Sequence, residues 1–284
     1  MSSNAPPPVP TAPPPSAPSL PPPPAGAVAA SSGTSATIGS LPPLMAPRVV
    51  LNAVEGWGKT STGAFAPDPV ILCATGENGY QTLLGAGLVP NIPAAVVNEW
   101  PEFLATLDAI AASCPYKTVV LDALGGFEAM CHRFVTVRDF KGDHGSKGFL
   151  NYHKGYDVSV TDWIGMLAKL DKIHAQGVAI LALSHCQDKN HPNPMGEDYM
   201  KTIGSMHPKT WAATKRWTDA ILYGKFLTIV DQKKGIGGTD RILYCEQRDA
   251  YDAKNRYGME PELMIPKEPA KVWVTILNAM KKGT

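Results

Sequence analysis

A glycine-rich segment that ends in Lys59-Thr60 is the part of this sequence whose residue types and spacing point most directly to chemistry. Residues 53–60 fit the form [AG]-x-x-x-x-G-K-[ST], which is typical of a phosphate-binding loop. In such a loop the backbone N–H groups surround the phosphates of a nucleotide, and the helix that follows adds its N-terminal dipole. We therefore predict that one continuous stretch binds the nucleotide, namely Ala53, Val54, Glu55, Gly56, Trp57, Gly58, Lys59, Thr60 and Ser61.

Two side chains of this loop have separate chemical roles. Lys59 is expected to reach the terminal phosphates as a mobile positive charge, and the Thr60 hydroxyl is expected to hold Mg²⁺. Ala53 stands where a glycine is usual. A methyl group is acceptable at that position if the local φ is negative, because only a positive φ strongly favours glycine.

Asp122 is the second candidate metal ligand. It directly follows the apolar, β-branched run 118–121, which predicts a buried strand. In open α/β folds, ligands bind at the carboxyl ends of the parallel strands. A carboxylate at that edge can hold Mg²⁺ beside Thr60, usually through a water molecule. The alternative is that Asp122 only caps the next turn, as aspartate often does after a strand.

Glu77 and His185 follow two further predicted strands at the same expected edge. A carboxylate there can orient and deprotonate the water that attacks a γ-phosphate, so Glu77 is our candidate base. Ala123 and Leu124 follow Asp122, where many ATPases carry their base, and this favours Glu77. We assign His185 the role of a sensor that reports hydrolysis. The alternatives are an exposed loop glutamate and a histidine with a purely structural hydrogen bond.

These residues need an α/β domain with a mostly parallel sheet, because short apolar strands alternate with helical stretches along the chain. We expect a hairpin through residues 235–238 near the C-terminus and a closing helix. The predicted strands are 49–52, 70–74, 118–121, 178–184, 220–223, 226–231 and 241–246. The predicted helices are 59–65, 100–113, 160–175, 209–218 and 269–282.

The first 47 residues differ in composition from the rest of the chain. They carry no charged side chain or histidine and are rich in Pro, Ala and Ser, which predicts a disordered tether before a domain at 48–284. The five cysteines are scattered without C-x-x-C spacing, which favours a reducing, cytoplasmic location over a disulfide framework or zinc site. No apolar run approaches the roughly 20 residues that span a membrane, so we expect no membrane partner.

The phosphate loop, the glutamate after the second strand, the aspartate after the third and the polar residue after the fourth together resemble the RecA-like P-loop ATPases. Residues 241–258 are also similar to the closing segment of phage-type nucleotide-binding proteins, which are often placed in the AAA family. The resemblance covers about residues 47–282. It implies a RecA-like core with strand order 5-1-4-3-2, ATP and Mg²⁺ as cofactors, and single-stranded DNA as partner. Lys59, Thr60, Glu77, Asp122 and His185 take the roles described above.

By this resemblance, the loops after the third and fourth strands, at about 125–157 and 187–209, would hold DNA. Both carry basic residues, and the first also carries aromatic residues that could stack on bases. The alternative is that both are solvated lids whose aromatic residues pack on the sheet. The candidate cations are Arg138, Lys141, Lys147, Lys189 and Lys201.

Self-association into a ring or filament is a further expectation for such ATPases, in which a cation from one subunit completes the site of the next. Arg248, Lys254 and Arg256 are the candidates, and ordinary surface residues are the alternative. The function that we expect is ATP hydrolysis coupled to single-stranded DNA in recombination, annealing or repair. A P-loop kinase acting on a small molecule and a nucleotide-gated binding module with little turnover remain alternatives.

Overall fold

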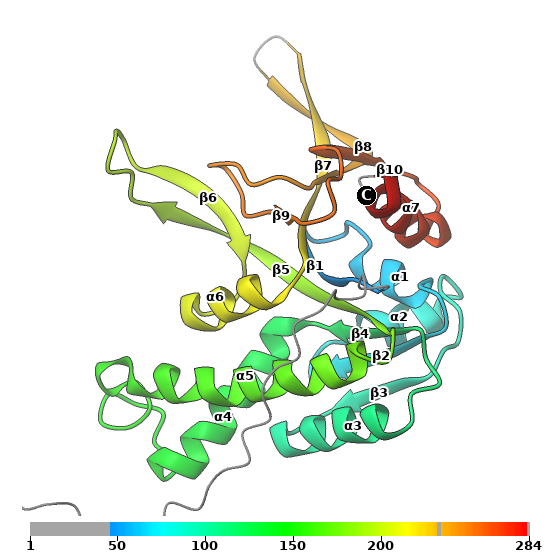
Figure 1. Ribbon diagram of the computed structural model, residues 1–284. Helices are drawn as coiled ribbons and strands as arrows, with labels where there is room; N and C mark the ends of the chain where they lie inside the picture. The colour runs from blue at the N-terminus through cyan, green and yellow to red at the C-terminus, as the bar shows by residue number, and fades with distance from the viewer. Residues whose placement is uncertain (1–45, 232–233, 283–284) are drawn as a thin grey trace, which may run out of the picture. The chain divides into compact units, whose positions relative to one another are not determined.

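A computed structural model describes residues 46–231 and 234–282, in which helices cover both faces of a mostly parallel sheet (Figure 1). The predicted tether lies outside the described residues except at its end. There the Pro47 carbonyl accepts a hydrogen bond of 2.9 Å from the Ile180 backbone, so residue 47 is part of the sheet region.

The strands are β1 (Arg48–Ala53), β2 (Pro69–Ala74), β3 (Ala94–Val97), β4 (Thr118–Asp122), β5 (Ala179–His191), β6 (Tyr199–Gly204), β7 (Ala220–Asp231), β8 (Lys234–Tyr244), β9 (Lys254–Asn255) and β10 (Glu262–Ile265). The helices are α1 (Lys59–Ala64), α2 (Gly79–Gly85), α3 (Trp100–Ala112), α4 (Leu124–Phe140), α5 (Lys154–His174), α6 (Pro208–Trp217) and α7 (Pro269–Lys282), with a short 3₁₀ helix at Asn151–His153.

The main path of the sheet runs β10-β8-β7-β1-β5-β4-β2-β3. The central strands β7, β1, β5, β4, β2 and β3 are parallel neighbours, whereas β8 and β10 add to one edge in antiparallel fashion. The five strands predicted to form the core are β1, β2, β4, β5 and β7, and their order confirms 5-1-4-3-2. The order places β1, which leads into the glycine-rich loop, in the middle of the sheet.

Two hydrophobic layers enclose the sheet, because successive side chains of each strand point to opposite faces. Val50 packs with helices α3 to α6 on one face, and its neighbours Val49 and Leu51 pack with α1, α2 and α7 on the other. Figure 1 shows α3, α4 and α5 together below the sheet and α7 above it. Burial on both faces explains why the central strands read as unbroken apolar runs.

The prediction of a long polar loop at 125–157 is wrong, because most of this segment is helical. Residues up to Phe140 form α4, which buries Phe127, Cys131 and Val135 at helical spacing. The start of α4 could not be predicted from the sequence, because the Gly125-Gly126 pair is typical of a turn. Gly126 is required there, since an added Cβ would lie 2.5 Å from the Cβ of Ala74. Tight packing of α4 on β2, not a turn, explains Gly126, whereas an added Cβ at Gly125 would lie 3.3 Å from the Ser205 carbonyl oxygen.

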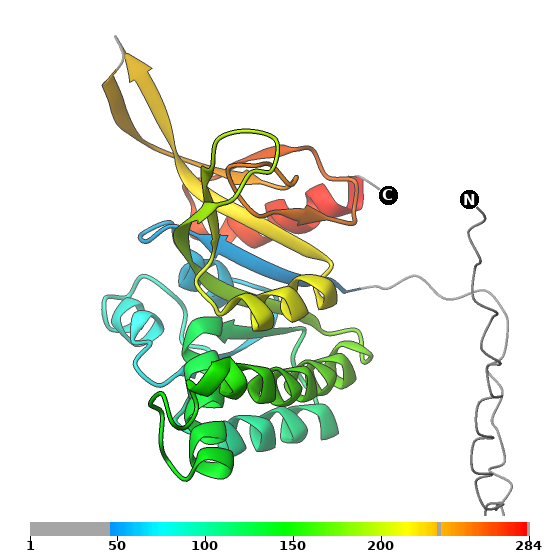
Figure 2. The ribbon, with the colours of Figure 1, turned by 90° about the vertical axis from the view of Figure 1, so that its left-hand side faces the viewer.

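The predicted loop at 187–209 and the predicted hairpin through 235–238 are corrected as well. Strand β5 continues beyond the sheet and pairs with β6 from Cys186 opposite Gly204 to His191 opposite Tyr199. Strand β7 is continuous where two strands were expected, and residues 235–237 pair with 230–228 inside the ladder. The β7–β8 ladder therefore continues past residues 235–238, up to Asp231 opposite Lys234. Figure 2 shows the β7–β8 hairpin extending away from the sheet.

Helix α2 and strand β3 were not predicted from the sequence. They are held by Tyr80, whose hydroxyl accepts a hydrogen bond of 2.9 Å from the Ile92 backbone and lies 3.2 Å from the Pro90 carbonyl. In the described part of the chain, no helix is long and apolar enough to cross a membrane.

Candidate functional site

The loop after β1 has the backbone that a phosphate-binding loop requires. Gly56 and Gly58 have φ values of 71° and 102°, which glycine adopts without strain. Buried Lys59 turns back into the loop, where its Nζ donates to the carbonyl oxygens of Ala53 at 2.7 Å and Val54 at 3.1 Å. Burial lowers the pKa of Lys59. An ammonium group is therefore held at the point where the loop would receive an anion.

Ala53 ends β1 and is not among the described residues with positive φ, so the negative φ that its methyl group needs is present. It pairs with His185 of β5 on one side and Gly224 of β7 on the other. The difference from the usual glycine therefore leaves the strand and the loop intact.

Trp57 fixes the loop to the neighbouring strands. Its buried ring lies against Gly224, where an added Cβ would be 2.8 Å from the ring. The guanidinium of Arg241 lies 5.4 Å from the ring centre and donates a hydrogen bond of 3.0 Å to the Trp57 carbonyl. Arg241 also donates to the carbonyls of Pro266 and Lys267, just before α7. It therefore connects the loop, β8 and the start of α7.

Thr60 and Asp122 meet beside this loop. The Thr60 hydroxyl donates a hydrogen bond of 2.8 Å to Oδ2 of Asp122. Asp122 is only 4% exposed, and burial raises its pKa despite that hydrogen bond. Two side-chain oxygens of the type that binds Mg²⁺ thus lie together, and the carboxylate is shielded from solvent.

The Thr60–Asp122 pair is typical of a Mg²⁺ site and not of a site in which protein side chains supply all the ligands. Among the described residues, no group of three or more His, Cys, Asp or Glu could hold a metal ion. Mg²⁺ usually binds through one or two protein oxygens and completes its shell with water and substrate phosphates. Thr60 and Asp122 supply that number and type of ligand, next to the ammonium of Lys59.

Glu77 and His185 form a second contact at the same edge of the sheet. Oε1 of Glu77 lies 3.5 Å from Nε2 of His185, and both side chains are partly exposed. This contact lowers the pKa of Glu77 and raises the pKa of His185. Glu77 is therefore ionised at neutral pH and held in place by the imidazole, while part of it still faces solvent.

The parallel sheet explains why these residues meet. Glu77 and Asp122 lie at or just after the carboxyl ends of β2 and β4, and the loop follows the carboxyl end of β1. His185 lies at the same level, where β5 ends its pairing with β1 opposite Ala53. The structure thus brings together the residues predicted to bind nucleotide and metal and to catalyse hydrolysis. Their catalytic roles stay predictions.

The three candidate trans cations lie elsewhere. Strand β9 pairs with the first residues of β7, which are level with the start of β1, about 10 to 13 Å along the strand from the point where the loop begins. Lys254 donates hydrogen bonds of 2.6 Å to the carbonyls of Lys215 and Thr218 at the end of α6. Arg256 contacts Asp219 at 3.2 Å, and exposed Arg248 contacts Glu246 at 3.2 Å. Within one chain, none of the three reaches the loop.

The five predicted DNA cations divide into two groups. Arg138 forms ion pairs with Asp139 and Asp162, and Lys201 contacts the buried carboxylate of Asp252 at 3.1 Å. The remaining three are exposed and have no ion pair among the described residues, namely Lys141, Lys147 and Lys189. Of the aromatic residues in the first predicted loop, Phe149 is buried but Tyr152 is 95% exposed.

Arg241 is the site residue that the sequence did not reveal. The large apolar ring of Trp57 inside the loop indicates that an apolar or cationic side chain covers it. No spacing rule, however, identifies an arginine 184 positions later in the sequence.

A protein-family model described as an AAA domain matches residues 45–257, which include the loop, Glu77, Asp122, His185 and Arg241. No curated protein matches the chain.

Proposed function

This chain belongs to the AAA domain family of P-loop ATPases, and from that premise we propose that it hydrolyses ATP with Mg²⁺ in response to single-stranded DNA. The arrangement of two contacts at one edge of the sheet carries the proposal. The Thr60–Asp122 contact places two oxygen ligands beside Lys59, and the Glu77–His185 contact lies at the same sheet edge. The side chains that the proposal requires therefore lie together: two oxygen ligands for a metal, a cation for the phosphates and a carboxylate for the attacking water.

In this proposal each residue has one task. Lys59 leaves its two carbonyl acceptors to bind the terminal phosphates, where its charge stabilises the transition state. Thr60 and Asp122 hold Mg²⁺, which when bound neutralises the charge on the phosphates. Glu77 orients the attacking water. A low pKa suits this role, since the carboxylate stays ionised while it accepts a hydrogen bond from that water.

We further propose that the chain acts on single-stranded DNA in recombination, annealing or repair, as its resemblance to RecA-like ATPases implies. The support is the observed strand order together with the segment 141–153, where exposed Lys141, Lys147 and Tyr152 combine charge with a ring that can stack on a base. Helix α4 begins two residues after Asp122 and ends next to this segment. It offers a direct mechanical connection between DNA and the metal ligand.

The test is ATP hydrolysis with and without single-stranded DNA. We expect stimulation by DNA in the wild type and loss of hydrolysis in Lys59→Ala. In Glu77→Gln we expect retained ATP binding with turnover reduced by at least about a hundredfold. Glu260→Gln, an exposed glutamate outside the site, is the matched control and should behave as wild type.

Each alternative gives a different result in the same assay. Normal turnover in Glu77→Gln would show that Glu77 does not act on the attacking water. Tight ATP binding without hydrolysis in the wild type would favour a nucleotide-gated binding module. Phosphate transfer to a small-molecule acceptor would indicate a kinase. If DNA changes neither turnover nor ATP affinity, the role in recombination loses its support.

A further inference from the structure

A groove of about 780 Å³ lies between the β5–β6 hairpin and α6, away from the candidate nucleotide site. We call it the basic groove. Its apolar surface comes from Pro192, Ile203, Pro208 and Ala212, over the nearly buried ring of Trp211. Its lining cations are Lys189, Lys201, Lys215 and Arg216.

The basic groove has an excess of positive charge. Its single carboxylate, Asp252, is buried and already contacts Lys201 at 3.1 Å and Lys215 at 2.9 Å. Exposed Lys189 and Arg216 have no ion pair among the described residues. The groove therefore suits an occupant that combines an apolar side chain with negative charge.

Nucleic acid fits the groove less well. Proteins that bind single strands stack bases on exposed aromatic rings. Trp211 is only 4% exposed and donates its indole N–H to Asp252 at 2.8 Å, so its face is not available for stacking.

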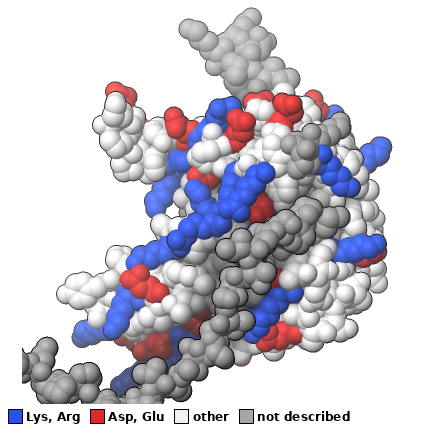
Figure 3. Space-filling view, in the orientation of Figure 1, with Lys and Arg blue, Asp and Glu red and all other residues white. Residues whose placement is uncertain are grey.

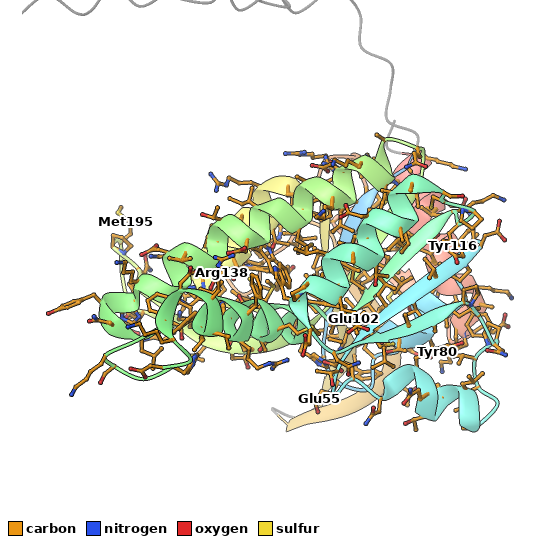
Figure 4. The ribbon with its side chains drawn as sticks, turned by 90° about the horizontal axis from the view of Figure 1, so that it is seen from below. Glu55, Tyr80, Glu102, Tyr116, Arg138 and Met195 are labelled. Atoms are coloured by element: carbon orange, nitrogen blue, oxygen red, sulfur yellow. The ribbon has the colours of Figure 1, made fainter. Side chains whose placement is uncertain are left out.

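The same chain presents a segment with the complementary chemistry. The turn between β5 and β6, residues 193–198, carries Met195, which is 94% exposed, and the carboxylates of Glu197 and Asp198. We call it the hairpin tip. Figure 4 shows Met195 standing clear of the main body of the fold. In Figure 3 acidic atoms cap the projecting knob at the upper left, and basic side chains form a band below it.

The hairpin tip is preorganised by its own hydrogen bonds. The Asn193 backbone donates to Asp198 at 3.1 Å, and the Asn193 side chain accepts from the Met195 backbone at 3.0 Å. Asp198 is thus partly used inside the turn. Glu197 has no ion pair among the described residues, so its charge is available. A rigid turn loses little conformational entropy when it binds.

The tip does not occupy the basic groove of its own chain. One wall of that groove is the β5–β6 hairpin itself, whose strands stay paired up to His191 opposite Tyr199. Beyond this pair, Met195 is 94% exposed and does not line the groove. Both the tip and the groove are therefore open to a second molecule.

We propose that the hairpin tip of one copy inserts into the basic groove of another, with Met195 against the apolar floor and Glu197 facing Arg216. Because tip and groove are different surfaces, the contact is heterologous, and repetition generates a ring or an open filament. A single turn buries less area than a stable interface needs, so the contact is weak and salt-dependent unless other surfaces join it.

A charge-exchange experiment tests this directly by sedimentation velocity on the full chain at low salt. Glu197→Lys and Arg216→Glu should each weaken self-association by about tenfold, because each places like charges in contact. An equimolar mixture of the two variants should associate again, since every tip then finds a complementary groove. The double variant on one chain should associate for the same reason.

Matched controls separate this from a general effect of charge or hydrophobicity. Lys147→Glu changes an exposed cation outside the groove and should leave association unchanged. Met195→Ser should weaken association, whereas Val137→Ser, at a residue that is 71% exposed on α4, should not. Restoration by the mixture also shows that both single variants are folded.

The proposal is overturned if the wild type stays monomeric at all concentrations, if the single variants associate as well as the wild type, or if the mixture fails to restore association. It is also overturned if Arg216→Glu abolishes binding of a fluorescent single-stranded oligonucleotide and leaves self-association unchanged. The groove would then be a nucleic-acid surface.

Discussion

Arg241 covers the ring of Trp57 at 5.4 Å and donates a hydrogen bond of 3.0 Å to the carbonyl of the same residue. Trp57 lies inside the phosphate-binding loop, and Arg241 lies on β8, opposite Phe226 in the β7–β8 hairpin. Figure 2 shows this hairpin projecting from the sheet. One guanidinium thus connects the loop that receives the nucleotide to a part of the fold distant from it in sequence.

Replacing Arg241 should loosen the loop. We expect Arg241→Gln to weaken ATP binding by about tenfold, because a charged hydrogen bond and a cation–π contact are lost together. Arg241→Lys should recover only part of the loss, since lysine cannot bond Trp57, Pro266 and Lys267 in the same planar geometry. Isothermal titration with ATP checks this, with Arg248→Gln as control. Unchanged affinity in Arg241→Gln would show that the loop holds its shape without it.

Gly224 should not tolerate a methyl group. In Gly224→Ala the new Cβ would lie 2.8 Å from the Trp57 ring and 2.9 Å from the Cβ of Ala53. Such overpacking costs about 1 to 3 kcal/mol of unfolding free energy. Gly165→Ala is the control: nothing lies within 4 Å of its added Cβ inside α5, so it should stabilise the protein by up to about 1 kcal/mol. Urea denaturation measures both, and equal effects would contradict the packing argument.

Asp122→Asn should separate metal binding from nucleotide binding. Without Mg²⁺, ATP affinity should equal that of the wild type, because Lys59 and the loop are unchanged. The increase in ATP affinity that Mg²⁺ produces should fall by at least about tenfold, because an amide is a weaker ligand than a carboxylate. Titrations with and without Mg²⁺ provide the readout, and exposed Asp249→Asn is the control. Full retention of the Mg²⁺ effect would exclude Asp122 as a ligand.

The Glu77–His185 contact should be visible as a pH effect. The pKa of Glu77 is lowered and that of His185 is raised, so the ion pair exists between the two values. Its stabilising contribution is lost as pH rises through the raised pKa of His185, and also as pH falls through the lowered pKa of Glu77. NMR titration should give His185 a pKa above about 6.5, which returns toward that value in Glu77→Gln and in high salt. If the pKa of His185 is the same in Glu77→Gln as in the wild type, the two side chains do not interact in solution.

Lys254 should act in stability and not in catalysis by a neighbouring subunit. Its ammonium binds carbonyl groups at the end of α6, so Lys254→Met should lower the unfolding free energy by about 1 to 2 kcal/mol. ATP turnover per folded molecule should be unchanged. Lys172→Met, an exposed lysine of α5 without an ion pair in the described part of the chain, should change neither quantity to a comparable extent. A large loss of turnover in folded Lys254→Met would instead restore the trans role.

The strands and the residues of the candidate site could be predicted because each depends on a short stretch of sequence, whereas the strand order was implied by the resemblance to RecA-like ATPases. The runs that contain Val49, Val119 and Leu181 are apolar on both faces, which identifies buried parallel strands. Helix α4 was missed because Gly125-Gly126 looks like a turn, whereas the real reason for Gly126 is its closeness to Ala74. The length of β5 was underestimated because residues after His185 are polar and gain their order only by pairing with β6.

The sequence alone determined the phosphate-binding loop, the carboxylates at Glu77 and Asp122, and the sheet that carries them. These depend on local backbone geometry and on the hydrophobicity of individual strands, which neighbouring residues specify. Only the tertiary structure showed that Arg241 holds Trp57, that Lys254 caps α6, and that a basic groove and an acidic hairpin tip are separate surfaces of one chain. Such contacts join residues far apart in the sequence, and their partners are decided by the packing of whole elements.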